Sequence, residues 1–321
     1  MAERRRWWRF LQVLIAVIVI ALAARSIARN WSQLQNQSIP WRVAPGWMLG
    51  SVLVVLSCFA LLIEAWRRVV VSQQQRLDFV PAARIWVLAN LGKYIPGKVW
   101  AIAGAAVLAE KAGVERGAAV TSALVLQALA LASGLMIVGV TGPWAMAGHG
   151  AYLLPLTILV AVTAGAGVLL LTSPRALARV QHMLPARLPT LRPISLTAAL
   201  AGFAVNAVAW CGYGLALTML AHGLASDVQL PWALSTAVFT ASYLVGLVAI
   251  LVPAGVGPRE SLFILLLTGP LGVKLAVGLA VASRILLTLT ELGAAVPFLV
   301  FSRLGQPPRP PALDNELSRN G

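Results

Sequence analysis

Two short segments rich in proline and glycine carry charged side chains into a chain that is otherwise apolar. They are NLGKYIPGKVW at Asn90–Trp100 and VPAGVGPRES at Val252–Ser261. Apolar stretches flank both segments, and a charged side chain inside a bilayer is costly unless it faces protein or a water-filled cavity. The segments are therefore the candidate functional site, and their charged residues are Lys93, Lys98, Arg259 and Glu260.

Both segments are predicted to stop one helix and start another, because proline lacks a backbone donor and glycine admits unusual dihedral angles. Pro96 and Pro258 suit the first position of a new helix. Gly257 fits an N-cap, and Glu260 falls in the first turn, where its charge meets the positive end of the helix dipole. Two helix N-termini near mid-membrane, with cations beside them, would attract an anion such as a phosphate or phosphodiester.

The last long apolar stretch supplies a second set of polar residues. Arg284, Thr288 and Glu291 stand at i, i+4 and i+7, so they share one face of a helix and must point inward. An alternative is that the charges only pair with one another, for example Arg259 or Arg284 with Glu260 or Glu291. Further candidates to line the same cavity are Gln127, Asn206, Ser242 and Tyr243.

Composition indicates a polytopic membrane protein of the all-α class. The chain has 321 residues, 59% of them hydrophobic and 11% charged, and its mean hydropathy is +0.84, which is far from a soluble domain. A helix needs about 20 apolar residues to cross the hydrocarbon core. Residues 1–303 are predicted to form one transmembrane domain, followed by a disordered cytoplasmic tail at 304–321. Seven stretches approach spanning length, near residues 10–28, 47–65, 118–141, 151–172, 196–222, 232–252 and 275–301.

The net charge of +15 comes from basic residues in short loops and tails. This distribution is the one that the positive-inside rule predicts, and it does not resemble a basic surface that binds nucleic acid. If the N-terminus is cytoplasmic, 17 of the 25 basic residues fall at inner positions, whereas the loops at 142–150 and 223–231 hold none. We therefore expect a cytoplasmic N-terminus and no nucleic-acid partner.

The same charge pattern predicts two re-entrant hairpins of opposite direction. Residues 82–110 begin and end with inner-type charges, so this stretch would dip in from the cytoplasm and return. For the tail to be cytoplasmic, the second hairpin, near 253–270, must enter and leave on the outer side. The order of parts repeats about 160 residues apart, as in an inverted repeat whose broken helices meet near the midplane. If 232–252 spans the bilayer outright, the tail lies outside and the inversion fails.

Metal and nucleotide chemistry find no support in the sequence. Cys58 and Cys211 lie inside apolar stretches, as packing residues do, and the three histidines lack a second ligand at metal spacing. Gly92–Lys98 fits the start of a phosphate-binding loop, G-x-x-x-x-G-K, but Val99 stands where a Ser or Thr would hold magnesium, and no strand precedes the segment. We therefore expect no metal site and no cofactor.

The blocks NLGKYIPGKVW and VPAGVGPRESLFILLL resemble the two signature blocks of the lysylphosphatidylglycerol synthase/flippase transmembrane family, and the likeness runs from about residue 10 to residue 303. The resemblance implies a bacterial inner-membrane protein that moves aminoacylated phospholipid, with relatives linked to hopanoid or glycolipid pathways. The aminoacyl transferase fused to some members is not expected here. Pro258 departs from the aliphatic residue that the family pattern has before the Arg-Glu pair. By position, the resemblance implicates in substrate binding Tyr94, Pro96, Gly97, Lys98, Trp100, Pro253, Gly255, Gly257, Arg259 and Glu260.

With Lys93, Arg284 and Glu291 added to that set, we expect a lipid flippase or scramblase and not an enzyme. Its polar groove would pass the headgroup of an anionic or aminoacylated phospholipid, or of a glycolipid, while the tails stay in the bilayer. One alternative is an intramembrane transferase acting on a lipid headgroup, although the sequence offers Glu260 as a base without a nucleophile to pair with it. Another is a structural partner of a separate lipid-modifying enzyme. The expected partners are membrane lipids, and the sequence names neither the lipid nor the oligomeric state.

Overall fold

The computed structural model describes residues 43–94, 99–145, 172–183, 193–225, 227–249 and 255–301. This part of the chain is helical and contains no strand, which confirms the all-α class. The apolar stretch at 10–28, residues 151–171 of the apolar stretch at 151–172 and the tail at 304–321 lie outside the described residues.

Four long apolar helices form the frame of the molecule: α3 (Pro45–Val71), α6 (Arg116–Ala145), α9 (Leu196–Leu224) and α12 (Val273–Phe301). Each contains at least 27 residues of spanning composition, which corresponds to about 40 Å of helix against about 30 Å of hydrocarbon. Large apolar side chains are exposed along these helices, for example Leu53 and Leu289. The protein is therefore a multi-pass helical membrane protein.

The remaining apolar helices are shorter and occur as two packed pairs. The first pair is α4 (Phe79–Asn90) and α5 (Val99–Lys111), with the 3-10 turn η1 (Leu91–Tyr94) after α4. The second pair is α10 (Trp232–Val248) and α11 (Pro258–Leu271). Helices of 12, 13, 17 and 14 residues are shorter than the roughly 20 residues needed to cross the bilayer. The structure thus breaks both apolar stretches in the expected places, and their depth in a bilayer stays a prediction.

The chain repeats one order of parts, namely long helix, short pair, long helix. The units are α3 to α6 and α9 to α12. Their contacts also correspond: α3 packs on α4 as α9 does on α10, α5 packs on α6 as α11 does on α12, and α4 packs on α12 as α10 does on α6. Helices α3 and α9, which correspond to each other, form the central contact. Exchange of the two units therefore leaves the pattern of packing unchanged.

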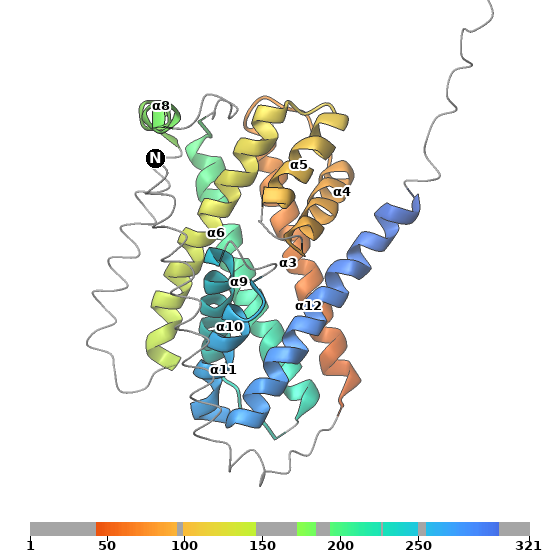
Figure 1. The fold of residues 1–321 in the computed structure, drawn as a ribbon, viewed down its shortest axis with the longest axis vertical. Helices are drawn as coiled ribbons and strands as arrows, with labels where there is room; N and C mark the ends of the chain where they lie inside the picture. The colour runs from red at the N-terminus through yellow and green to blue at the C-terminus, as the bar shows by residue number, and fades with distance from the viewer. Residues whose placement is uncertain are drawn as a thin grey trace, which may run out of the picture.

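The two units run in opposite directions. The Ala44 amide before α3 donates to the Gly223 carbonyl at the end of α9 (2.9 Å), and Ser51 Oγ farther along α3 donates to the Ala216 carbonyl (2.7 Å). Helices α3 and α9 are therefore antiparallel. In Figure 1, α4 and α5 lie in the upper half of the bundle, and α10 and α11 lie in the lower half. This arrangement agrees with the predicted inverted repeat.

Glycine lets the backbone of each short pair close tightly at its break. A Cβ on Gly255, whose φ is +69°, would lie 2.7 Å from the Cα of Gly246 on α10. In the first pair, a Cβ on Gly92 would lie 2.8 Å from the backbone nitrogen of Ala101 on α5. Because real Cβ atoms do not approach so closely, any side chain at either glycine would push its pair of helices apart.

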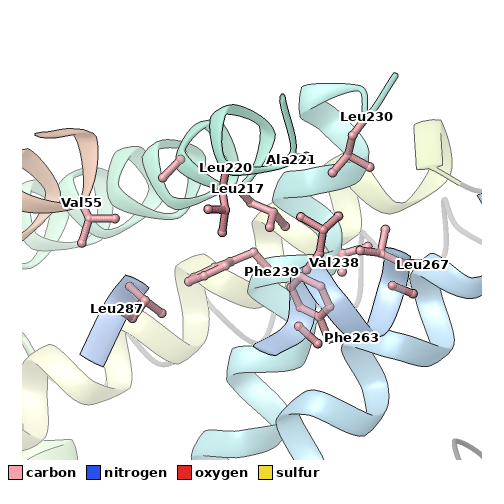
Figure 2. Packing of buried hydrophobic residues seen from close by; sticks show 14 of the residues in the cluster. Val55, Leu217, Leu220, Ala221, Leu230, Val238, Phe239, Phe263, Leu267 and Leu287 are labelled. Carbon is pink, nitrogen blue, oxygen red and sulfur yellow. The ribbon is translucent and has the colours of Figure 1, made fainter. Parts of the chain in front are cut away.

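The main apolar core joins the second unit to α3. Phe239 and Val238 of α10 pack there with Phe263 of α11, and Figure 2 shows these side chains meeting those of the neighbouring helices. The core fixes α10 and α11 against the long helices, and so it determines where the charged residues of the second break are held. The other labelled members in Figure 2 are Val55, Leu217, Leu220, Ala221, Leu230, Leu267 and Leu287.

Candidate functional site

Helix α11 begins at the second break as the sequence predicts. Pro258 occupies the first helical position and Gly257, with a φ of +92°, is the N-cap. The Gly257 amide donates to Glu260 Oε2 at 2.8 Å, so the glutamate caps the N-terminus of its own helix. Pro258, which departs from the family pattern, suits this position because the first residue of a helix has no hydrogen-bond partner for its amide.

The second oxygen of Glu260 links α11 to α12. Arg284 Nη1 donates to Glu260 Oε1 at 2.9 Å, and the two side chains are 20% and 22% exposed. This is one of the pairings that the sequence left open. Through this pair, the carboxylate of the second break is attached to the middle of α12.

The first break is attached to α12 through Glu291. Lys93 Nζ, from η1, forms an ion pair with Glu291 Oε1, and the Tyr94 hydroxyl donates to Glu291 Oε2 at 2.7 Å. Tyr94 also lies 3.3 Å from Thr288 Oγ1. The Glu291 side chain is only 7% exposed, and both of its oxygens are occupied by donors from η1.

Helix α12 therefore carries both attachments on one face. Arg284 and Glu291 are seven residues apart, which is about 10 Å along a helix. The sequence predicted this shared face from the spacing. It did not predict that Lys93 would be the partner of Glu291, because the two residues are separated by 198 positions.

Among the described residues of the site, Arg259 is the cation that these pairs do not use. Its side chain is buried, with 6% exposed, and its guanidinium carbon lies 5.4 Å from the Phe239 ring centre and 5.6 Å from that of Tyr243. Within the described residues, Nη2 has no hydrogen-bond partner and no carboxylate forms an ion pair with Arg259. A desolvated cation–π contact is worth about 2 kcal/mol, whereas burying an ion costs several kcal/mol. The rings thus offset only part of the cost of this charge.

The rings beneath Arg259 belong to an aromatic cluster that the sequence did not single out as a unit. Phe239 stacks on Tyr213 with a centroid distance of 5.1 Å, and Tyr243 meets Trp210 edge-on at 5.4 Å. The spacing of Phe239 and Tyr243, i and i+4 on one predicted helix, was the available signal. Tyr243 was expected to line the cavity, and it lies against Arg259.

The remaining candidate residues either have surroundings other than the two ion pairs and Arg259 or lie outside the described residues. Trp100 is 55% exposed on α5, and Gly255 lies at the tight approach to Gly246. Asn206 donates within its own helix to Gly202, and Gln127 is exposed on α6. Ser242 is buried, with no partner for its hydroxyl among the described residues. The candidates outside the described residues are Pro96, Gly97, Lys98 and Pro253.

An apolar groove of about 610 Å³ opens between α3 and α12 and is lined by Leu56, Ile285 and Leu289 among others. A smaller hollow beside it shares Leu220 and Leu286 with the groove and is lined also by Phe239. Phe239 is therefore both part of the wall of this hollow and the ring against which Arg259 lies.

The family profile described as the lysylphosphatidylglycerol synthase TM region matches residues 9–291, which include both breaks and most of α12. The chain belongs to this family. Membership indicates a role connected with membrane lipids, in agreement with the resemblance seen in the two breaks. A search of the curated proteins found no match.

Proposed function

We propose that the protein moves a lipid between the leaflets of the bilayer, as a flippase or scramblase, and leaves the headgroup chemically unchanged. The observation that carries the proposal is the attachment of both broken elements to one face of α12, through Lys93 with Glu291 and through Glu260 with Arg284. Broken helices that meet around a polar face are the arrangement of substrate sites in inverted-repeat transporters.

The groove supports a lipid as the substrate. Its wall is apolar and lies between two helices of spanning length, so an acyl chain can occupy it without leaving an apolar environment. The hollow beside the groove has Phe239 in its wall, and the buried guanidinium of Arg259 lies against the ring of Phe239. A lipid therefore finds surfaces for its tails and for a charged headgroup within one region of the protein.

We place the α4 and α5 end of the bundle in the bacterial cytoplasm. Helix α8 (Pro174–Met183), with exposed Arg175 and Arg179, lies at that end in Figure 1, as does the end of α3 with Arg68. Lys111 ends α5 there as well. Basic residues concentrate on the cytoplasmic side of bacterial membrane proteins, so the distribution supports an inner-membrane protein with this orientation.

Leaflet exchange in liposomes tests the proposal. Purified protein reconstituted with a trace of fluorescent phospholipid is expected to speed the loss of signal when a membrane-impermeant quencher is added outside. Glu291→Gln, which removes the charge that holds Lys93, is expected to slow exchange by about tenfold or more, since a hydrogen bond to a charged group is worth about 1.5–3 kcal/mol.

Glu64→Gln is the matched control, because Glu64 pairs with Arg67 and Arg68 at the end of α3, away from the breaks. Its exchange rate is expected to equal that of the parent protein. Equal slowing by both changes would argue against a site at α12. A change in headgroup mass after incubation would instead favour the transferase, and absence of both activities in folded protein would favour a structural partner.

A further inference from the structure

The charges of the site do not cancel. Lys93, Arg259 and Arg284 bring three positive charges, and Glu260 and Glu291 bring two negative ones, so one positive charge remains among the described residues. The two pairs use four of the five groups. The excess charge is therefore located on the buried guanidinium of Arg259.

Neither carboxylate is open to a cationic group on a substrate. Glu260 accepts from Arg284 and from the Gly257 amide, and Glu291 accepts from Lys93 and Tyr94. The sequence contains no other acidic residue between 79 and 109 or between 228 and 313, so the undescribed parts of the two breaks, 95–98 and 250–254, add none. An ammonium group entering the site would find cations and no unoccupied carboxylate.

An anionic oxygen finds the opposite situation. Arg259 Nη2 is buried and has no hydrogen-bond partner among the described residues. Buried polar groups in native proteins are nearly always partnered, so this charged nitrogen is available to donate to an acceptor on a substrate. A phosphodiester oxygen has the charge and the acceptor geometry that a guanidinium binds best.

We infer that the lipid carried has a phosphodiester with one negative charge and an uncharged headgroup, and that an aminoacylated, cationic headgroup is excluded by the charge of the site. The inference rests on the proposed function and deepens it. A lipid is favoured over a free anion because the apolar groove is lined by α12, the helix to which both breaks are attached.

A comparison of three labelled lipids tests the inference. They have the same acyl chains and differ in headgroup: phosphatidylglycerol with net charge −1, zwitterionic phosphatidylcholine, and lysylphosphatidylglycerol with net charge +1. Phosphatidylglycerol is expected to exchange at least about tenfold faster than the lysyl lipid, because like charges placed together in a binding site are strongly disfavoured. Phosphatidylcholine is expected to fall between the two.

Arg259→Gln is expected to bring the three rates together, and Arg259→Lys to keep part of the preference. The readout is a ratio of rates within one preparation, so partial misfolding of a variant lowers every rate and leaves the ratio unchanged. Arg68→Gln, an exposed residue at the end of α3, is the control that keeps the full ratio.

The outcomes separate the two proposals. If the lysyl lipid moves as fast as phosphatidylglycerol, or if Arg259→Gln keeps the preference, the inference is overturned while leaflet exchange stands. If the folded protein moves none of the three lipids, the proposed function fails and the inference falls with it.

Discussion

The two breaks share one architecture and differ in their chemistry. In the second break the charged residues follow the break: Arg259 and Glu260 belong to the first turn of α11, and Glu260 caps that helix. In the first break Lys93 and Tyr94 precede it, on η1, and their carboxylate is supplied by α12. The repeated packing therefore supplies the scaffold, and local residues decide which side chains hold each break in place.

The corresponding long helices differ in the same way. Helix α12 meets η1 with Thr288 and Glu291, whereas α6, its counterpart, meets α10 with Gly134 against Leu244. Helix α6 has no charged residue after Arg116. The charged side chains that hold the two breaks thus come from α12 and not from α6, so the repeated order of helices does not by itself determine where the site lies.

The largest stability effect is expected from the buried pair of the first break. Glu291→Ala leaves Lys93 without a counterion in a site that is mostly buried, and removal of one partner of such a pair costs about 3–5 kcal/mol. The double change Lys93→Met with Glu291→Ala is expected to recover most of that loss, because no unpaired charge remains. Thermal unfolding in detergent measures both. If the double variant is no more stable than the single one, the pair is not the source of the effect.

A smaller loss is expected from the glycines at the two breaks. Gly255→Ala and Gly92→Ala each place a Cβ against backbone closer than 3 Å, and the resulting strain is expected to cost about 1–3 kcal/mol. Gly293→Ala on α12, where nothing lies within 4 Å of the new Cβ, is the matched control and should be neutral or slightly stabilising. Similar unfolding temperatures for all three variants would show that the close approaches are dispensable.

The smallest effect is expected at the pair of the second break. Arg284→Met removes one partner of Glu260, but the carboxylate keeps its hydrogen bond from Gly257 and both side chains are partly exposed. We expect a loss of about 1–2 kcal/mol, less than that caused by Glu291→Ala in the same unfolding assay. A loss larger than that of Glu291→Ala would reverse the comparison and make the second break the stronger attachment.

Local features of the site could be predicted from the sequence. Pro258 at the start of a helix, Gly257 as its cap and Glu260 in its first turn depend only on neighbouring residues. The common face of Arg284, Thr288 and Glu291 follows from helical periodicity alone. The end of α10 at Val248 was less certain, because an apolar stretch to 252 is long enough to span. The structure ends the helix four residues earlier, near the tight contact of Gly246 with Gly255.

Composition and charge by themselves determined that this is a helical membrane protein with two broken apolar stretches, because hydropathy, proline and glycine act over short distances along the chain. Only the tertiary structure decided which charges meet. Lys93 forms its ion pair with Glu291, 198 positions away in the sequence. Arg259 has no such pair within the described part of the chain and lies against the rings of Phe239 and Tyr243. Such partners depend on how helices distant in sequence pack, and several pairings of the same five charges satisfy the sequence equally well.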